Sequence, residues 1–418
     1  MNKKSNIDLQ VSGVILKARG QLTALSLYRL WNRTFKVKKI IALALAGSML
    51  MTTTVFARTP RFNRSDEEWA TLEDNNLEFN EIESLISEYN ATVRSNEVVF
   101  AKFKKDYGST NTQVSDHYRE SAQEILDNLP DPDPSDPTYI SALSAVANSR
   151  ATAQNLLSTA DSTLEDAEII RLGYEQTEKT LVQTAVTNMI SYKSGLVGIE
   201  TAKSNLELAN IEYTVAQAKL SAGTGTNIEL LNAKEKVLSK EKEVKDAQSE
   251  SSTLLKKLQV MTGWSYDASP QVGELPMPDI NREFNPNADL DEAIKNNYSL
   301  RINEKKLGNA KSQSDRETLE TTIADNKAHI ATSLTVASQN ITAAKENYNY
   351  AAEFAKLQEN NLSIANQRYN LGLISKSELE TQKFTTLNSK DSLIRTQYAL
   401  LQAIVNYDFA VKGLASVS

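Results

Sequence analysis

The side chains that most often carry enzyme chemistry are sparse and scattered in this sequence. Its two histidines, His117 and His329, have no GxSxG, Walker or HExxH pattern beside them, so we expect ordinary packed or solvated side chains. There is no cysteine, which excludes disulfides, thiolate catalysis, cysteine-based zinc sites and lipid attachment at an N-terminal cysteine. The sequence therefore predicts that the protein is not an enzyme and holds no cofactor.

Carboxylates cluster at one place, residues 130–137, which read Pro-Asp-Pro-Asp-Pro-Ser-Asp-Pro. Aspartates at this density could coordinate calcium, but four prolines stiffen the segment and it lacks the glycine that a calcium loop uses for its turn. Proline also cannot continue a helix. We therefore interpret the segment as a solvated linker and expect no metal site in it.

Two short breaks combine glycine with hydroxyl residues, and an acid follows each of them. The first, 221–226, reads Ser-Ala-Gly-Thr-Gly-Thr and precedes Glu229; the second, 370–375, reads Asn-Leu-Gly-Leu-Ile-Ser and precedes Glu378. Glycine permits the positive φ of a tight turn at the end of a helix. The two acids either cap the outgoing helices, as acids near a helix N-terminus do, or present negative charge at the turns.

Heptad seams lie on both sides of the first break, which indicates that a helix precedes it and another helix follows it. Before the break, apolar residues recur at spacings of three and four from Ile199 to Leu220, with alanine at every second position. After the break, a second seam runs from Leu230 to Leu258. Two such helices joined by about six residues form an antiparallel helical hairpin.

The same arrangement returns near the end of the chain. An offset of 149 residues places Gly223 on Gly372 and also aligns the residues that follow, Glu229 with Glu378, Leu230 with Leu379 and Leu238 with Leu387. We infer an internal duplication. In the second copy we expect a helix over 290–323, a turn at 324–327 and a seam from Ile330 to Tyr369.

Apolar periodicity also predicts helices earlier in the chain, over 77–107, 115–129 and 139–220. Composition supports this helical interpretation, because 14 Gly, 9 Pro and 7% aromatic residues in 418 are few for a compact mixed fold. Residues 1–57 carry nine Lys or Arg against one Asp, a charge of +8, so the overall charge of −7 leaves −15 for the remainder. A chain that acidic repels phosphate backbones, and we expect no nucleic-acid binding.

Residues 1–57 have the features of an export signal. Four basic residues between 33 and 39 precede an uncharged apolar run, 40–51, and Val-Phe-Ala at 55–57 forms a small-residue cleavage pattern. We expect cleavage after Ala57. The alternative is an uncleaved membrane anchor, although the run of 12 residues is short for ~30 Å of hydrocarbon. Because residues 1–36 are unusual in front of an export signal, we also expect them to be a mis-assigned extension, with Val37 as the initiator.

The two breaks and their flanks resemble the inner-end turns of the TolC family of outer-membrane efflux proteins. The family pattern is glycine, a few small or hydroxyl residues, an acid, leucine and then an alanine-spaced helix. Here it reads Ala-Gly-Thr-Gly-Thr-Asn-Ile-Glu-Leu-Leu-Asn-Ala at 222–233 and Arg-Tyr-Asn-Leu-Gly-Leu-Ile-Ser-Lys-Ser-Glu-Leu at 368–379. The resemblance is best over 181–263 and 290–413.

The resemblance implies a homotrimer in which each copy supplies two hairpins to an α-helical tube. The turns would meet a periplasmic adaptor, also called a membrane fusion protein, which joins the tube to an inner-membrane pump, and substrate would pass through unchanged. Glu229 and Glu378 would line a lumen constriction, unless they only cap helices. The implied adaptor-docking residues are Gly223, Thr224, Arg368, Leu371, Gly372, Leu373, Ile374 and Ser375.

The sequence departs from the family where each repeat should insert a pair of membrane-spanning strands. Such a strand needs ~9–11 alternating residues. Residues 330–336 alternate, but Ile330, Leu334 and Ile341 also fit the heptad seam, so we expect a plain helical reversal near Asp325. The corresponding part of the first repeat, 108–160, has a helical, Asp/Pro-rich pattern. We therefore expect a mainly α fold, a trimeric α-barrel of long antiparallel hairpins with little or no β-barrel.

The expected organisation has six parts along the chain. They are 1–57, extension and signal; 58–156, lead-in with the Asp/Pro-rich insert; 157–264, first hairpin; 265–289, linker; 290–413, second hairpin; and 414–418, tail. We expect an exported protein of the cell envelope, located at the outer membrane by resemblance.

Two other functions fit part of the pattern. A cell-surface coiled-coil structural or adhesion protein would explain the helices and the signal, but not the matched turns. An adaptor also has a helical hairpin, but it needs flanking β-rich domains, for which the sequence has no signal.

Overall fold

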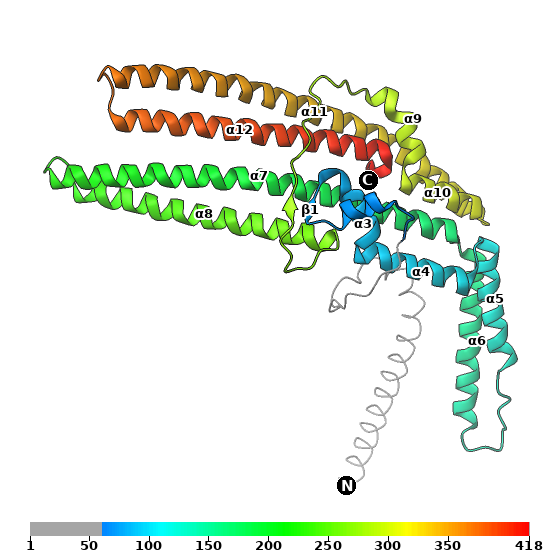
Figure 1. The fold of residues 1–418 in the computed structure, drawn as a ribbon. Helices are drawn as coiled ribbons and strands as arrows, with labels where there is room; N and C mark the ends of the chain where they lie inside the picture. The colour runs from blue at the N-terminus through cyan, green and yellow to red at the C-terminus, as the bar shows by residue number, and fades with distance from the viewer. Residues whose placement is uncertain (1–60, 418) are drawn as a thin grey trace, which may run out of the picture. The chain divides into compact units, whose positions relative to one another are not determined.

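The computed structural model describes residues 61–417. The chain divides into two compact units, Met1–Ala57 and Arg58–Ser418, and the described residues all belong to the second. The predicted signal, its cleavage site and the N-terminal extension lie outside the described residues. The described part is almost entirely helical (Figure 1), which confirms the mainly α fold class. None of the helices within 61–417 is both long and apolar enough to cross a membrane.

The first long hairpin consists of α7 (Ala167–Ser221) and α8 (Asn227–Met261), which pack along their length (Figure 1). The seam of α7 is rich in alanine, as the heptad pattern predicts, and Ala202 and Ala209 are buried in it. Small side chains at a helix contact allow a short distance between the two axes.

The helix predicted over 139–220 is interrupted. It divides into α6 (Tyr139–Ser162) and α7, so the prediction of one continuous helix is wrong. Thr163 has an extended backbone, with φ −65° and ψ 132°, and Asp166 caps α7 by accepting a hydrogen bond from the Ile169 N–H at 2.9 Å. A capping aspartate can start a new helix without any glycine or proline nearby.

The second long hairpin pairs α11 (Gln313–Asn370) with α12 (Lys376–Phe409) (Figure 1). The turn predicted at 324–327, with the reversal near Asp325, is wrong, because α11 continues through these residues. Ile323 and Ile330 are both buried and lie on the same side of the helix. A chain reversal between them would expose apolar surface that the continuous helix buries.

The chain reverses earlier, at 310–311, between α10 (Tyr298–Asn309) and α11. Ser312 caps α11 by accepting a hydrogen bond from the Asp315 N–H at 3.0 Å. Residues 330–336 lie inside α11, with Ile330 and Leu334 fully buried. This confirms that the alternating stretch belongs to the heptad seam.

The long helices lie side by side in the order α8, α7, α12, α11. Packing contacts join α7 to α8, α7 to α12, and α12 to α11 (Figure 1). Two apolar clusters hold the layer together at the end away from the hairpin turns, one around Met189 and Leu258 and the other around Ile330 and Tyr407. Within residues 61–417, neither α8 nor α11 has a long helix on its other side, so these two helices are the edges of the layer.

Shorter elements connect and brace the two repeats. After α8 the chain forms β2 (Gln271–Val272), which pairs in parallel with β1 (Asn76–Leu77). It then forms α9 (Pro286–Asn296), which packs with α10 against α11. The chain ends beyond η2 (Ala410–Leu414), which packs against α9.

The chain before the first hairpin is also helical, and Asn90 interrupts the helix predicted over 77–107. Asn90 caps the following helix by accepting hydrogen bonds from the backbone of Thr92 and Val93. The elements here are α2 (Asp66–Leu72), η1 (Phe79–Glu81), α3 (Ile82–Tyr89) and α4 (Ala91–Tyr107).

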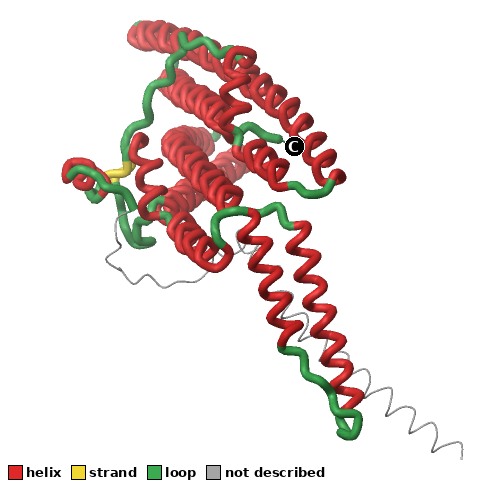
Figure 2. The backbone as a smooth tube through the Cα atoms, turned by 90° about the vertical axis from the view of Figure 1, so that its right-hand side faces the viewer, coloured by secondary structure: helices red, strands yellow, loops and turns green. Residues whose placement is uncertain are grey.

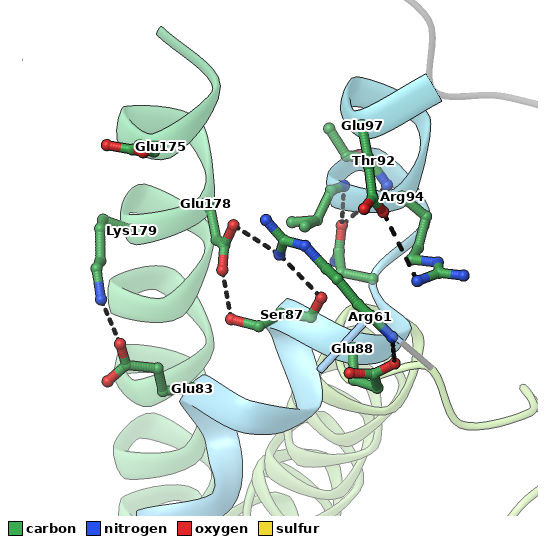
Figure 3. A network of polar contacts seen from close by, with 12 residues as sticks. Arg61, Glu83, Ser87, Glu88, Thr92, Arg94, Glu97, Glu175, Glu178 and Lys179 are labelled. Atoms are coloured by element: carbon green, nitrogen blue, oxygen red, sulfur yellow. Dashed lines mark hydrogen bonds and ion pairs between the residues drawn. The ribbon is translucent and has the colours of Figure 1, made fainter. Parts of the chain in front are cut away.

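A polar network fastens the start of the described chain to α3 and α7 (Figure 3). The Arg61 guanidinium donates to the Glu178 carboxylate at 2.9 Å and to the Ser87 carbonyl at 3.1 Å. Ser87 also donates its hydroxyl to Glu178, and Lys179 pairs with Glu83. These contacts place the first described residues against the first hairpin.

A second, shorter hairpin precedes the first long one in the chain. It consists of α5 (Asn111–Asp127) and α6, with the Asp/Pro-rich segment 130–137 as the loop at its free end (Figure 2). This confirms the prediction of a helical insert with a solvated linker. Hydrogen bonds from Ser135 and from Thr138 lower the pKa of Asp133 and Asp136 respectively. No group of three His, Asp or Glu in 61–417 is placed to hold a metal ion.

Candidate docking tips

Each long hairpin ends in a glycine turn, and the two turns have the same backbone geometry. We call residues 221–226 tip 1 and residues 370–375 tip 2. Gly223 has φ +73° and Gly372 has φ +74°. A Cβ added at either glycine would meet no atom within 4 Å, so the conformation of the backbone, and not lack of space, is what favours glycine here.

Both turns close with the same pair of hydrogen bonds. In tip 1 the Gly223 N–H donates to the Leu220 carbonyl at 3.0 Å and the Thr224 N–H donates to the Lys219 carbonyl at 2.9 Å. In tip 2 the equivalent bonds join Gly372 to Tyr369 and Leu373 to Arg368, both at 2.9 Å. This is the Schellman arrangement, which satisfies the last carbonyls of the incoming helix.

The acids after the turns cap the outgoing helices. In tip 1 the Thr226 N–H donates to the Glu229 carboxylate at 2.8 Å, while the Thr226 hydroxyl accepts from the Glu229 N–H at 3.2 Å. Ser375 and Glu378 form the same capping box in tip 2, at 2.7 and 3.2 Å. The bonds from Ser375 lower the pKa of Glu378. The structure therefore shows the helix-capping role that the sequence left open, while a lumen role for these acids stays a prediction.

The two tips differ in the surface that they expose. In tip 2, Leu371 is 73% and Leu373 is 65% exposed, with Arg368 exposed beside them and Ile374 half-buried. The positions equivalent to Leu371, Leu373 and Ile374 hold Ala222, Thr224 and Gly225 in tip 1, whereas Arg368 corresponds to Lys219, which is also exposed. Tip 2 is therefore an apolar surface beside a cation, whereas tip 1 is mainly polar.

Gly225 marks a further difference between the tips. Its N–H donates to the Lys219 carbonyl at 3.0 Å, and a Cβ here would lie 2.9 Å from the Lys219 Cβ. Tip 2 has Ile374 at this position and makes no second bond of this kind to Arg368 among the described contacts. Tip 1 is thus the tighter turn.

The two histidines lie far from the tips in sequence and belong to ordinary packing. The His117 ring packs on the Tyr107 and Tyr118 rings, with centroids 4.6 and 6.0 Å away. His329 lies 3.5 Å from Asp325 on the exposed side of α11. Neither pairs with a serine or cysteine among the described contacts, and no group of three His, Asp or Glu in 61–417 is placed to hold a metal ion.

The exposed faces of the edge helices, α8 and α11, were not predicted from the sequence. On α11, residues spaced by seven remain exposed outside the buried seam, and the row continues into tip 2 at Leu371: Val336, Ala343, Tyr350, Leu357 and Ile364. On α8, Leu231 and Leu238 are exposed in the same way, seven residues apart. The heptad spacing was a usable signal, but deciding which face is buried requires the order of the helices in the layer.

No protein-family model matches this sequence. No curated protein matches it either. Among solved structures, the outer-membrane channel OprN is similar at 12% identity with a TM-score of 0.50, covering 88% of this chain and 99% of that chain. The CmeC outer-membrane channel of Campylobacter jejuni has 13% identity and a TM-score of 0.45, covering 90% and 96% of the two chains. The outer-membrane protein VceC of Vibrio cholerae has 11% identity and a TM-score of 0.47, covering 80% and 96%.

At these identities the likeness concerns the fold alone. The comparison of folds rests on OprN, whose TM-score is 0.50. The described chain therefore has the helical fold of an outer-membrane channel.

Proposed function

We propose that this protein is a TolC-like exit duct of a tripartite efflux or secretion system. Three copies would form an α-helical tube, the tips would dock on a periplasmic adaptor connected to an inner-membrane pump, and substrate would pass through the lumen unchanged. The observation that carries the proposal is an open layer of long helices with an uncovered apolar row on each edge. The fold shared with OprN supports it.

The exposed apolar rows on α8 and α11 run in opposite directions, and their residues lie at equal distances from the tip glycines. The chain leaves tip 1 along α8 and approaches tip 2 along α11, so the two helices are antiparallel when the tips lie together. Leu231 lies eight residues after Gly223, and Ile364 lies eight residues before Gly372. Edge α8 of one copy can therefore cover edge α11 of the next with leucine and isoleucine at the same level.

The same count pairs the next positions along both edges. Leu238 and Leu357 both lie fifteen residues from the tip glycines, and Lys245 and Tyr350 both lie twenty-two. Tyr350 is 72% exposed, and the face of its ring can accept a lysine ammonium. Because the two edges of one copy are different surfaces, their contact is heterologous, and a heterologous contact that closes makes a ring.

The ring would bring the tips of all copies together at one end. Leu371, Leu373 and Arg368 of tip 2 would then form an apolar and cationic docking surface for the adaptor, with Gly223 and Gly372 holding both turns. Glu229 and Glu378 follow the turns directly, so their carboxylates would add negative charge near the narrow end of the lumen. The proposal includes a location in the cell envelope, at the outer membrane, and the fold shared with OprN supports it.

The absence of cysteine makes the ring directly testable. A Leu238→Cys/Leu357→Cys double variant cannot close a disulfide within one copy, because α7 and α12 lie between the two edges. Mild oxidation should give covalent dimers and trimers on a non-reducing gel, whereas each single variant should stay monomeric. Double-variant protein that stays monomeric would reject the ring and favour a non-transporting cell-surface coiled-coil protein.

Adaptor docking has its own test. Leu373→Asp should abolish co-purification of a periplasmic adaptor from the cell envelope, because the substitution places a carboxylate in the apolar surface of tip 2. Val260→Asp, at an exposed position of α8 remote from the tips, is the matched control. If both variants retain the adaptor equally, tip 2 is not the docking surface.

A further inference from the structure

One face of the layer has a hollow that takes no part in the proposed ring contacts. Its volume is about 470 Å³, and residues of α8, α7 and α12 line it. Because α7 lies between the other two helices in the layer, α8 and α12 must both project beyond α7 on this face. The layer is therefore concave at the hollow.

The linker between α8 and α9 crosses the long helices on the opposite face (Figure 1). Lys193 of α7 pairs with Glu274 of the linker at 2.8 Å, and Gln397 of α12 donates to the sulfur of a linker methionine at 2.7 Å. Gly198, which lines the hollow, lies about 140° around α7 from Lys193. Arg395, which also lines it, lies about 160° around α12 from Gln397.

The curvature of the layer gives the hollow its place in the proposed duct. When α8 of one copy covers α11 of the next, the ring continues the curvature, so the concave face turns towards the lumen and the linker lies outside. This placement rests on the proposed duct. The hollow itself is formed within a single copy and does not depend on the ring.

Two opposite charges line the hollow without pairing. Arg395 comes from α12 and Glu250 from α8, and both residues are exposed. Neither forms an ion pair or a side-chain hydrogen bond with another residue of 61–417. The rest of the lining is uncharged, with small, hydroxyl and apolar residues such as Ser194, Ala247 and Leu254. Each of the two charges is therefore free to pair with a charge of an incoming molecule.

We propose that the hollow is a contact site in the lumen wall for small zwitterions, such as short peptides and peptide-like compounds. The carboxylate of the zwitterion pairs with Arg395, its ammonium pairs with Glu250, and its body lies over Gly198. A Cβ added at Gly198 would meet no atom within 4 Å, so the space in front of this glycine is open.

The dimensions fit a molecule of this class. Neighbouring helix axes lie ~8–10 Å apart, so the axes of α8 and α12 are at most ~20 Å apart. An extended tripeptide spans ~10 Å, and the Arg395 and Glu250 side chains reach into the remaining distance. The volume of the hollow also lies in the range of small-molecule sites, ~300–1,000 Å³.

The exposure of both charges suits a duct. Ion pairs formed in contact with water are weak, so the hollow holds a zwitterion only briefly. Conduction requires such weak contacts, because a tightly bound substrate would not leave the lumen.

The test measures binding of the tripeptide Ala-Leu-Ala to the purified full chain by isothermal titration calorimetry. The unmodified tripeptide should bind up to about fivefold more tightly than its N-acetyl form or its C-terminal amide, as expected for exposed ion pairs. Arg395→Gln should remove the difference between the tripeptide and its amide, and Glu250→Gln the difference between the tripeptide and its N-acetyl form. Arg316→Gln, at an exposed cation of α11 outside the hollow, should retain both differences.

A second variant fills the hollow without removing a charge. Gly198→Leu projects a side chain into the open space and should abolish binding, while leucine is a better helix former than glycine and should leave α7 intact. Gly173→Leu is the matched control, because Gly173 also lies in α7 with open space beside it but does not line the hollow. This control should bind as the wild type does.

Light scattering on the same samples separates failure of the site from failure of the duct. A trimer that binds none of the three peptides, or all three equally, would overturn the zwitterion site and leave the duct standing. A Gly198→Leu variant that binds as the wild type does would show that the peptide binds elsewhere. Selective binding by a protein that is monomeric would keep the site but reject its place in a lumen, together with the duct.

Discussion

The glycines of the tips offer a sharp test of the turn geometry. Gly372→Ala adds a methyl group into open space but leaves an alanine at φ +74°. A left-handed conformation costs an L-residue roughly 1–2 kcal/mol, of which about 0.4–1 kcal/mol can be offset by the lower entropy of the unfolded chain. The turn should therefore weaken by up to about 1.5 kcal/mol.

The matched control is the same substitution in the interior of α7. Gly173 also has no atom within 4 Å of an added Cβ, but it is helical, so Gly173→Ala should stabilise by roughly 0.5–1 kcal/mol. Hydrogen-exchange mass spectrometry reads both effects locally. Peptides covering 368–375 should exchange up to about tenfold faster in Gly372→Ala, since 1.4 kcal/mol is a factor of ten. Equal and same-signed effects at the two glycines would refute the argument.

Three further predictions concern the cap, the core and the long helix. Hydrogen bonds from Ser375 lower the pKa of Glu378. The ionised Glu378 cap therefore stabilises α12 fully at pH values above the pKa of an unfolded Glu, about 4.3, and this stabilisation is lost as the pH falls through the lower pKa of the folded state. Amide exchange at the start of α12 should therefore rise on acidification in the wild type, and Glu378→Gln should abolish this dependence on pH. Met189→Ala should cost about 2–5 kcal/mol in urea unfolding, against about 0.5 kcal/mol or less for the exposed Met277→Ala. Asn326→Pro should cost about 3 kcal/mol or more because α11 is continuous there, and a variant as stable as the wild type would restore the turn at 324–327.

The sequence sufficed for features that depend on periodicity and on glycine. The seams around 221–226 and 370–375 predicted both long hairpins, and Gly223 and Gly372 have the positive φ that the tight turns required. The prolines of 130–137 likewise located the free end of the short hairpin.

It failed where side-chain caps alone redirect the chain. Asp166 and Ser312 start new helices in stretches whose breaks carry no proline or glycine, so helices were predicted across them. Such caps depend on a single hydrogen bond to the backbone, and Asp or Ser occurs at many other positions without capping.

The exposed faces of the edge helices, α8 and α11, escaped prediction for another reason. Tyr348 packs in the core while Tyr350 is 72% exposed, although both lie in the same amphipathic helix. Because α11 is at the edge of the layer, only one side of this helix contacts other long helices of the same chain. The order of the helices in the layer is a property of the tertiary structure, so the sequence does not show which of the two tyrosines is buried.

The native mass of the protein, measured by light scattering on the wild type and on Leu357→Asp, tests the duct most directly. We predict three copies for the wild type. Leu357→Asp should dissociate the ring, because closing it would bury an unpaired carboxylate against Leu238. A wild-type mass of one or two copies, or a Leu357→Asp variant that keeps three, would contradict a ring closed through α8 and α11.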